Sequence, residues 1–349
     1  MEIERYLFWN ERLVMSNEAY PKRWLSTFPG FRLPLHLKQM GVPETCAHRS
    51  GWGYVMEHLA KKQHQNGIIL DDFVERTFQH QGMRQTWKEP WVGIFHHPQN
   101  LPLWFDETAP PHVITKLPEF KSSLPWLKGA IALSSHLGQW LKNTLDVPVM
   151  VIKHPTEVPL LQFSMEKWNN SQNKQLVQVG WYARNYRGIY QVPVPQGFRK
   201  LHLLQNQPWV RAAMQRTDTK SPLMNRADIG EVTVLQRLSN NEYDELLSST
   251  IIFCEYLDVS ASNTVIEAIA RNTPIVLNRL PANEEYLGAN YPLFFEHINE
   301  VPLLLNQCQR IEDAFVMLRD SDKSWISGEA FAEQVLQFVQ RVTNGWKNV

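Results

Sequence analysis

Three small polar residues, Ser262, Asn263 and Thr264, open a predicted helix and could bind an anion there. They follow a polar loop, and the helical segment continues to Ala270. The first backbone N–H groups of a helix have no intrahelical acceptors and lie at the positive end of its dipole, so they suit a diphosphate. The same residues could simply cap the helix, and capping is compatible with phosphate binding.

Glu267 could add hydrogen bonds to a ligand held at this helix end. It lies four residues beyond Asn263, which is about one helical turn on and on the same face. A carboxylate at that distance could reach ribose hydroxyls while the helix end holds the phosphates. The apolar neighbours Ile266 and Ala268 indicate a half-buried helix, and a buried carboxylate needs a partner such as a ligand hydroxyl. The alternative is an ordinary surface carboxylate.

One glycine and two arginines follow the strand predicted over residues 175–179. Gly180 ends that strand, and Arg184 and Arg187 come shortly after it. Arginine suits phosphate because its guanidinium presents a planar fork of donors. We expect these residues to lie opposite the helix that begins near Ser262 and to contact the same phosphates. Either arginine could instead be solvated.

The elements that must position these residues alternate between short apolar runs and amphipathic helical segments. The predicted strands cover residues 67–72, 91–96, 130–134, 147–152, 175–179, 199–204, 232–236, 250–254 and 274–277. The predicted helices cover residues 135–145, 239–247, 262–270 and the tail from 328. Such alternation predicts largely parallel sheets with crossover connections, so the fold class is α/β. The first forty residues contain no clear strand.

A polar stretch over residues 157–174 separates two similar α/β halves. A chain of 349 residues is too long for one ordinary core and suits two domains. We therefore expect a first domain over residues 1–160 and a second over residues 161–327. The tail, residues 328–349, has the apolar spacing of an amphipathic helix and could pack back on the first domain.

Composition argues against several classes of partner. Lys plus Arg equals Asp plus Glu, at 35 each, so no overall field favours nucleic acid or anionic lipid. No apolar run approaches the roughly 18 residues of a membrane span, and the N-terminus lacks the apolar segment of a signal peptide. The three cysteines are too few and too scattered for a disulfide framework or a zinc site. We expect a cytoplasmic protein with no nucleic acid partner and no integral membrane segment.

The chain holds 13 tryptophans, which is a high number. Several stand beside proline or charged residues, as at Trp87, Trp91 and Trp126. Packing in the core and between domains is one interpretation, since aromatic side chains bury large areas. An acceptor groove lined by indole faces is the other, since the C–H faces of sugars pack well on indole.

The segment from Val232 to Leu287 resembles the donor site of family-4-like GT-B glycosyltransferases (glycosyl transferases group 1). Glu267 and Ala268 match the second Glu of that family's pattern and the Ala after it. Residues 272–276, Asn-Thr-Pro-Ile-Val, resemble its Gly-Thr-Pro-Val-Val turn and strand. Upstream, the segment that carries Gly180, Arg184 and Arg187 is similar to the family's phosphate-contacting element, Val-Gly-Arg followed by Lys-Gly.

The first half of the chain resembles the same family more loosely. Residues 130–140 are similar to its Ala-Val-Ser strand and the helix that follows. Gly51, Trp52 and Gly53 lie roughly where the family carries a glycine-rich loop on the acceptor side. A lone Gly-x-Gly could also be an ordinary turn.

The resemblance implies the GT-B architecture, in which two Rossmann-like domains face a cleft. It implies a glycosyltransferase that moves a sugar from a nucleotide-diphosphate sugar to a glycan, lipid or small-molecule acceptor, with retention of configuration. The first domain would hold the acceptor, and the second would hold the donor. The nucleotide sugar is then a co-substrate, and neither a cofactor nor a metal is implied.

The resemblance also implies catalytic roles. GT-B enzymes often carry a histidine that faces the donor sugar across the cleft, and His96 and His97 stand at such a place. Glu267 would act with one of them, although either histidine could be structural. The pair Asp71 and Asp72 is not the Asp-x-Asp metal motif of the other glycosyltransferase fold, and we expect it to cap a strand end.

One position departs from the family pattern. The family's first Glu falls at Val259, which cannot form a hydrogen bond with a sugar hydroxyl. Asp258 is the adjacent carboxylate, Glu255 is slightly earlier, and either could substitute. The departure leaves open a catalytically silent GT-B-like nucleotide-binding or scaffold subunit. A GT-B-shaped epimerase or hydrolase is a third alternative, although no second acid–base pair marks it.

Overall fold

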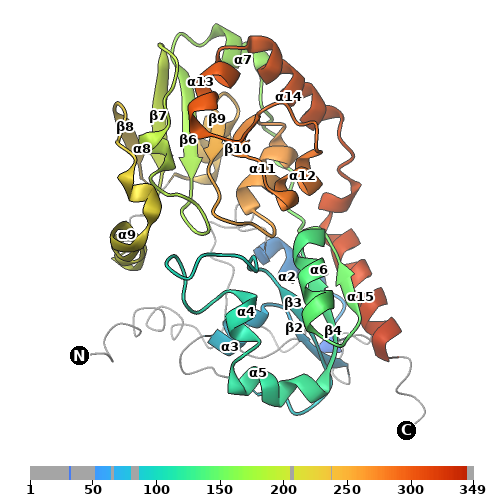
Figure 1. Ribbon diagram of the computed structural model, residues 1–349. Coiled ribbons are helices and arrows are strands. Elements are labelled where there is room, and N and C mark those ends of the chain that lie inside the picture. The colour runs from blue at the N-terminus through green and yellow to red at the C-terminus, as the bar shows by residue number, and fades with distance from the viewer. Residues whose placement is uncertain are drawn as a thin grey trace.

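The structure is a computed structural model that describes residues 31–32, 52–63, 67–79, 86–204, 208–236 and 238–343. It contains two separate parallel sheets with helices packed around them, in the lower and upper parts of Figure 1. The expected α/β class with two Rossmann-like halves is confirmed. We call the first sheet and the elements that pack on it the N-terminal domain, and the second sheet and its helices the C-terminal domain.

The N-terminal domain has five parallel strands whose spatial order follows the chain. They are β1 (Phe31–Arg32), β2 (Ile68–Asp71), β3 (Trp91–Phe95), β4 (Leu127–Ala132) and β5 (Val149–Val151). The last four overlap the strands predicted from apolar runs. β1 lies where no strand is predicted, because two residues are too short to show a pattern.

The C-terminal domain has six parallel strands in the spatial order β11-β10-β9-β6-β7-β8. They are β6 (Lys174–Val179), β7 (Phe198–Leu203), β8 (Val232–Leu235), β9 (Ile251–Cys254), β10 (Ile275–Asn278) and β11 (Phe294–Phe295). The chain runs outward from β6 to β8 and then returns to the other side of β6. The neighbours β6 and β9 therefore form a topological switch point, and open α/β sheets bind ligands at the carboxyl ends of such strands.

Local sequence signals fix the ends of the helices. In the N-terminal domain these are α2 (Trp52–Ala60), α3 (Val74–Gln79), α4 (Pro111–Ile114), α5 (Pro118–Ser123) and α6 (Ser135–Thr144). In the C-terminal domain they are α7 (Met165–Asn170), α8 (Gly188–Gln191), α9 (Pro208–Lys220), α10 (Asn240–Leu247), α11 (Asn263–Arg271), α12 (Pro281–Leu287), α13 (Val301–Leu305) and α14 (Cys308–Asp320). Ser134 caps α6, and Ser239 and Glu242 form a capping box that starts α10. Asn272 ends α11 with a left-handed φ of 59°.

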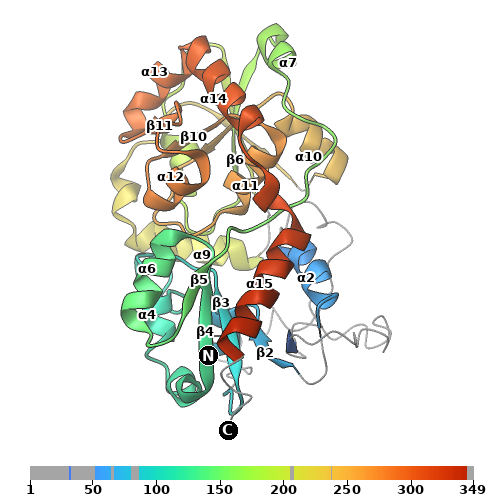
Figure 2. The same ribbon diagram turned by 90° about the vertical axis from the view of Figure 1, so that its right-hand side faces the viewer.

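The last helix, α15 (Gly328–Thr343), packs on the N-terminal sheet. Its buried Phe331 and Phe338 belong to one apolar cluster with Val92 of β3 and Ile131 of β4. Figure 2 shows α15 lying across this domain beside α2. The chain thus crosses between the two domains twice, and its last helix completes the core of the first.

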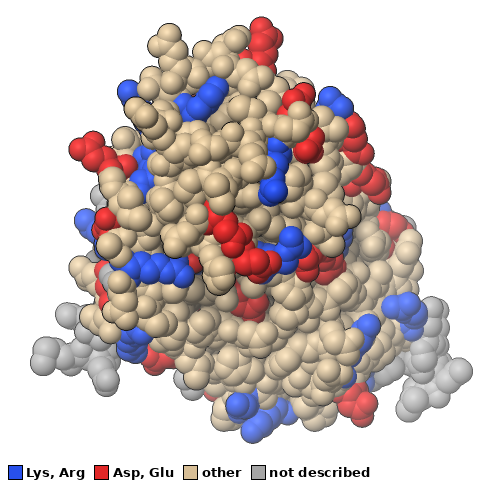
Figure 3. All heavy atoms as spheres, turned by 45° about the horizontal axis from the view of Figure 1, so that its top comes forward, with Lys and Arg blue, Asp and Glu red and all other residues tan. Residues whose placement is uncertain are grey.

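The surface carries both signs of charge. On the face shown in Figure 3, basic and acidic side chains are intermixed, and neither forms a continuous patch. In the part of the chain that the structure describes, every helix is too short or too polar to cross a membrane.

Two of the tryptophans singled out in the sequence are core residues. Trp91 is 0% exposed and donates from its indole to the Ser123 carbonyl at 2.9 Å. Trp87 is 7% exposed and donates to Asp71 Oδ2 at 3.0 Å. Trp126, by contrast, is 37% exposed. The packing interpretation therefore holds for Trp87 and Trp91.

Candidate functional site

The loops that follow β6 and β9 pair with each other at the switch point. The N–H of Asn185 donates to the Glu255 carbonyl at 2.7 Å. The residue before Asn185, Arg184, and the residue after Glu255, Tyr256, form an antiparallel bridge. This short backbone ladder fixes the start of the Arg184 side chain between the two strand ends.

Arg184 reaches from this ladder to the start of α11. Its Nη2 donates to Thr264 Oγ1 at 2.8 Å and to Ser262 Oγ at 3.2 Å. Ser262 is the N-cap residue of α11, but its side chain makes no capping hydrogen bond. Its hydroxyl instead lies 2.6 Å from Tyr256 Oη. With Asn263, the first residue of the helix, these residues form what we call the Arg184 cluster (Arg184, Ser262, Asn263 and Thr264).

The charge of Arg184 is buried and is not balanced by a carboxylate. The residue is 9% exposed, and it makes no ion pair with any residue that the structure describes. Its Nε is buried without an acceptor among the same residues. The guanidinium lies 5.2 Å from the centre of the Tyr256 ring, which compensates its charge only in part. Since a buried cation is costly without an anionic partner, the cluster has the electrostatics of an anion site.

Gly180 gives the Arg184 side chain its space. Its φ is +72°, a left-handed conformation that suits glycine. A Cβ at this position would lie 2.6 Å from Arg184 Nη1, which is far too close. Ala183, in the same loop, also has a left-handed φ, of 59°. Backbone conformations of this kind cost on the order of 1 kcal/mol or more and gather at functional sites.

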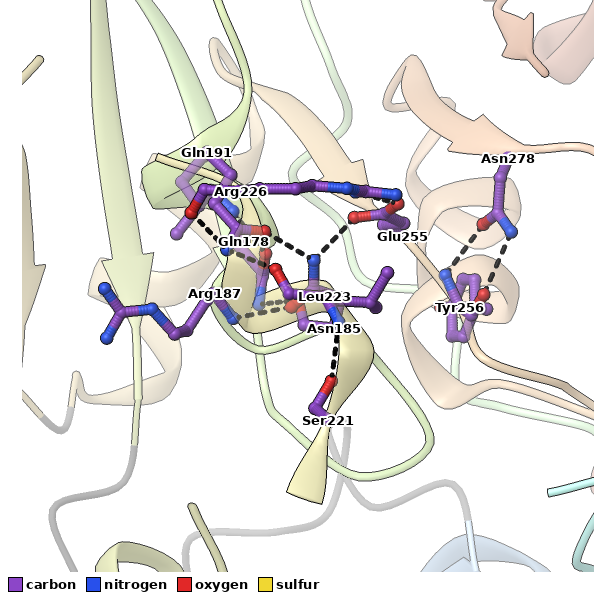
Figure 4. A network of polar contacts seen from close by, with 11 residues as sticks. Gln178, Asn185, Arg187, Gln191, Ser221, Leu223, Arg226, Glu255, Tyr256 and Asn278 are labelled. Atoms are coloured by element: carbon purple, nitrogen blue, oxygen red, sulfur yellow. Dashed lines mark hydrogen bonds and ion pairs between the residues drawn. The ribbon is translucent and has the colours of Figure 1, made fainter. Parts of the chain in front are cut away.

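Arg187 does not join the cluster. Its guanidinium pairs with Asp228, and Figure 4 shows its side chain extending away from Tyr256. Among the described arginines of this loop, Arg184 is thus the one that meets the start of α11. The spacing in the sequence does not distinguish the two arginines, because their partners come from distant segments of the chain.

Glu255, one candidate for the missing family carboxylate, is held inside a polar network (Figure 4). Its Oε2 accepts a hydrogen bond from Asn185 Nδ2 at 2.7 Å. Its Oε1 pairs with Arg226 Nη1 at 2.5 Å. The same Asn185 amide donates to Gln191 at 2.9 Å. Both carboxylate oxygens of Glu255 therefore have partners within the protein.

Asp258, the other candidate, joins the two domains. Its Oδ2 accepts the N–H of Asn100, from the N-terminal domain, at 2.9 Å. Its Oδ1 accepts the N–H of Val259 at 2.9 Å and lies 3.7 Å from His136 Nε2. Burial raises the pKa of Asp258 above its usual value. Val259 itself is 4% exposed and packs in the C-terminal core.

Glu267 lies on the buried side of α11 and is 3% exposed. Tyr243 Oη, from α10, donates to its Oε2. Arg271 Nη1 lies 4.0 Å from the same oxygen, and the Arg271 guanidinium also pairs with Asp244 at 2.8 Å. The partners that a buried carboxylate requires are thus supplied by the protein itself.

His96 and His97 lie in different environments. His96 packs edge-on against Trp52, with ring centroids 4.2 Å apart, and stacks on Phe73 at 4.0 Å. Burial lowers the pKa of His96 well below its usual value, so this imidazole is neutral. The ring of His97 lies 4.9 Å from that of Tyr182, which belongs to the loop after β6. His97 is therefore the histidine that contacts the C-terminal domain.

A buried carboxyl group that the sequence does not mark supports this histidine pair. Glu75 Oε1, from α3, accepts hydrogen bonds from the backbone N–H groups of both His96 and His97 at 2.9 Å. Glu75 is 0% exposed, and its Oε2 has no hydrogen-bond partner among the described residues. Burial raises the pKa of Glu75 to about 8. Only the fold reveals this group, since α3 is too short to carry an amphipathic pattern.

The predicted acceptor-side loop is placed in part. Trp52 Nε1 donates to Asp72 Oδ2 at 2.8 Å, and Gly53 is the second residue of α2. Gly51 lies outside the described residues. Asp71 accepts the backbone N–H two residues on at 3.3 Å, so it caps the strand end as expected. In the described parts of the chain, no three His, Cys, Asp or Glu side chains are arranged to hold a metal ion.

The chain is similar in fold, rather than in sequence, to known proteins. No family model and no curated protein matches its sequence. The sucrose-phosphate synthase of Thermosynechococcus elongatus superposes with a TM-score of 0.55 at 13% identity, over 79% of this chain and 74% of that one. An α,α-trehalose-phosphate synthase (UDP-forming) from Burkholderia vietnamiensis gives 0.51 at 11% identity, over 85% and 79%. WaaG, a glycosyltransferase involved in lipopolysaccharide biosynthesis, gives 0.50 at 12% identity, over 84% and 82%.

These matches extend over most of the chain and therefore cover both parallel sheets. The fold implied by the resemblance of the sequence is confirmed. The chain has the GT-B fold of glycosyltransferases.

Proposed function

We propose that the protein is a glycosyltransferase that binds a nucleotide-diphosphate sugar at the Arg184 cluster. The observation that carries this proposal is the buried guanidinium of Arg184, which meets hydroxyls at the start of α11 and pairs with no described carboxylate. A diphosphate would supply the missing negative charge, and the amino end of α11 would add the favourable end of its dipole. Proteins of similar fold named as a sucrose-phosphate synthase and a UDP-forming trehalose-phosphate synthase support this assignment.

The Arg184 cluster would also assist the transfer itself. Negative charge develops on the leaving nucleoside diphosphate as the glycosidic bond breaks, and fixed cations and dipoles stabilise it without a metal ion. Gly180 would let the backbone approach the phosphates. Glu267 would order α11 through Tyr243, and ribose hydroxyls would compete with Tyr243 for its carboxylate.

The N-terminal domain would hold the acceptor. His97 contacts the donor-side loop, whereas His96 packs on Trp52 and Phe73 of its own domain, so we propose that His97 faces the donor sugar. A glycan, lipid or small-molecule acceptor would bind beside His97 and Trp52. Transfer would retain configuration, as in the family that the sequence resembles.

A second candidate function is that of a catalytically silent nucleotide-binding subunit. The observation that favours it is the buried Val259 at the position of the family's first Glu. The nearby carboxylates of Glu255 and Asp258 already have partners in the protein. A silent subunit would bind nucleotide at the Arg184 cluster and leave the sugar intact.

Isothermal titration with UDP, GDP, ADP and TDP tests the donor site. We expect at least one of these nucleotides to bind, and failure of all four would refute both candidate functions. Release of the nucleoside diphosphate from the matching nucleotide sugar then separates the two. Turnover supports the transferase, whereas binding without turnover favours the silent subunit.

A further inference from the structure

A chain of three hydrogen-bonded side chains crosses between the domains beside the Arg184 cluster. Tyr182 stands two residues before Arg184 in the loop after β6. Its Oη lies 3.0 Å from Asp106 Oδ2 and 3.0 Å from His97 Nδ1, and both of these belong to the N-terminal domain. Burial, followed by the Asp106 carboxylate, raises the pKa of Tyr182 well above its usual value, so the phenol keeps its proton.

The partners determine where each hydrogen lies. A carboxylate oxygen accepts, so the Tyr182 hydroxyl donates to Asp106 Oδ2. The carbonyl of Ala109, 3.2 Å from His97 Nδ1, can likewise only accept. His97 Nδ1 must therefore carry the hydrogen, which it shares between this carbonyl and the Tyr182 oxygen. In the neutral imidazole the lone pair then lies on Nε2.

Asp106 is itself held firmly by the β3–α4 loop, which Figure 1 shows rising from the lower domain toward the upper. Its Oδ1 accepts the N–H of Thr108 at 2.9 Å and that of Ala109 at 3.0 Å, so Oδ2 is directed by a tight turn. The ring of Phe105 packs edge-on against Tyr182, with centroids 5.6 Å apart. The Tyr182 hydroxyl is therefore positioned from two directions, by packing and by hydrogen bonding.

We propose that Tyr182 and Asp106 are positioning residues that hold His97 as its Nδ1–H tautomer and fix the orientation of its ring beside the Arg184 loop. This inference rests on the proposed function, in which His97 faces the donor sugar. Because Tyr182 comes from the other domain, the arrangement exists only while the two domains are in contact. The loop that carries Arg184 would then both bind the donor and orient the histidine, which couples His97 to domain closure.

The substitution Tyr182→Phe tests this inference because it removes the hydroxyl and keeps the ring that packs on Phe105. Tyr186→Phe is the matched control. Tyr186 lies in the same loop and is 5% exposed, but its hydroxyl bonds within the C-terminal domain, to Asp218 and the Met214 carbonyl. Heteronuclear NMR of the imidazole nitrogens distinguishes the two neutral tautomers, and a His97→Gln variant identifies the His97 signals.

At alkaline pH, where the imidazole is neutral, we expect the Nδ1–H form in the wild type and in Tyr186→Phe. In Tyr182→Phe the ratio of Nε2–H to Nδ1–H should rise by about five- to tenfold, the effect of losing one hydrogen bond. The inference is overturned by an Nε2–H form in the wild type. An unchanged ratio in Tyr182→Phe, or an equal change in Tyr186→Phe, also overturns it.

Titration of the same variants with UDP, GDP, ADP and TDP separates this inference from the proposed function. Tyr182→Phe should bind the nucleotide with wild-type affinity to within about threefold, because the Arg184 cluster is intact. If no nucleotide binds the wild type, the proposed function fails, whatever the tautomer of His97. If Tyr182→Phe loses affinity about tenfold or more, the hydroxyl supports the Arg184 loop instead of His97, and the inference is wrong.

Discussion

Replacing Arg184 by Gln tests the anion site directly, because a neutral amide can still form hydrogen bonds with the neighbouring hydroxyls. The guanidinium has two such partners, Thr264 at 2.8 Å and Ser262 at 3.2 Å, and has no described carboxylate. A hydrogen bond to a charged group contributes about 1.5–3 kcal/mol. We therefore expect the Kd of the bound nucleoside diphosphate to rise by about 10- to 150-fold.

The same substitution should not destabilise the nucleotide-free protein. At 9% exposure, Arg184 holds a desolvated charge that the described residues do not neutralise. Removing an uncompensated buried charge relieves an electrostatic cost. We expect the free energy of unfolding of Arg184→Gln, measured in urea without nucleotide, to equal or exceed that of the wild type. Affinity and stability would then change in opposite directions.

Isothermal titration supplies the affinities, and Arg187→Gln is the control. Arg187 is an arginine of the same loop, but it pairs with Asp228 outside the cluster. It should keep nucleotide affinity to within about threefold. Wild-type affinity in Arg184→Gln, or an equal loss in Arg187→Gln, would refute the reasoning.

Three further predictions concern the backbone at Gly180, the titration of Glu75 and the buried ion pairs of Arg271. Gly180→Ala should weaken nucleotide binding, since its Cβ would lie 2.6 Å from Arg184 Nη1 and would displace the guanidinium. Gly197→Ala, with a φ of +88° and open space, should lose similar stability and keep binding in the same titrations. Burial raises the pKa of Glu75 from 4.5 to about 8, so this carboxyl group binds its proton more tightly in the folded protein, and the free energy of unfolding should fall as the pH rises between these values. Urea denaturation should show a shallower fall in Glu75→Gln. A fall as steep as that of the wild type would contradict this prediction. Arg271→Met leaves two buried carboxylates without their cation and should lower the unfolding free energy by about 3–5 kcal/mol, whereas a change below about 1 kcal/mol would contradict this.

The sequence predicts the strands well because most of them are short apolar runs bounded by turns. The strands β6 and β7 are less clear, since Lys174–Val179 and Phe198–Leu203 include polar and charged residues among the apolar ones. The order of the strands is less accessible. The contact between β6 and β9 joins Leu176 to Ile251, and no local pattern encodes a pairing at that separation.

The candidate site is predictable where it depends on one element and unpredictable where it depends on two. The polar start of α11 is visible in the sequence, whereas its contact with Arg184 needs the left-handed loop after β6. Glu267 illustrates the limit. The position of Glu267 on the buried side of α11 can be inferred from its apolar neighbours. Its partner Tyr243, however, comes from another helix, 24 residues away. Which of His96 and His97 contacts the other domain is likewise decided by Tyr182 rather than by their own sequence.

The placement of α15 has a consequence for how the protein is made. The face of the N-terminal sheet that includes Val92 and Ile131 packs against Phe331 and Phe338, which are synthesised after the whole C-terminal sheet. During translation the C-terminal sheet can therefore assemble while the earlier sheet still exposes an apolar face, which invites aggregation or chaperone binding. The core of the N-terminal domain is therefore completed only after the C-terminal sheet has been synthesised. A variant truncated before Gly328 should keep this apolar face of the N-terminal sheet exposed.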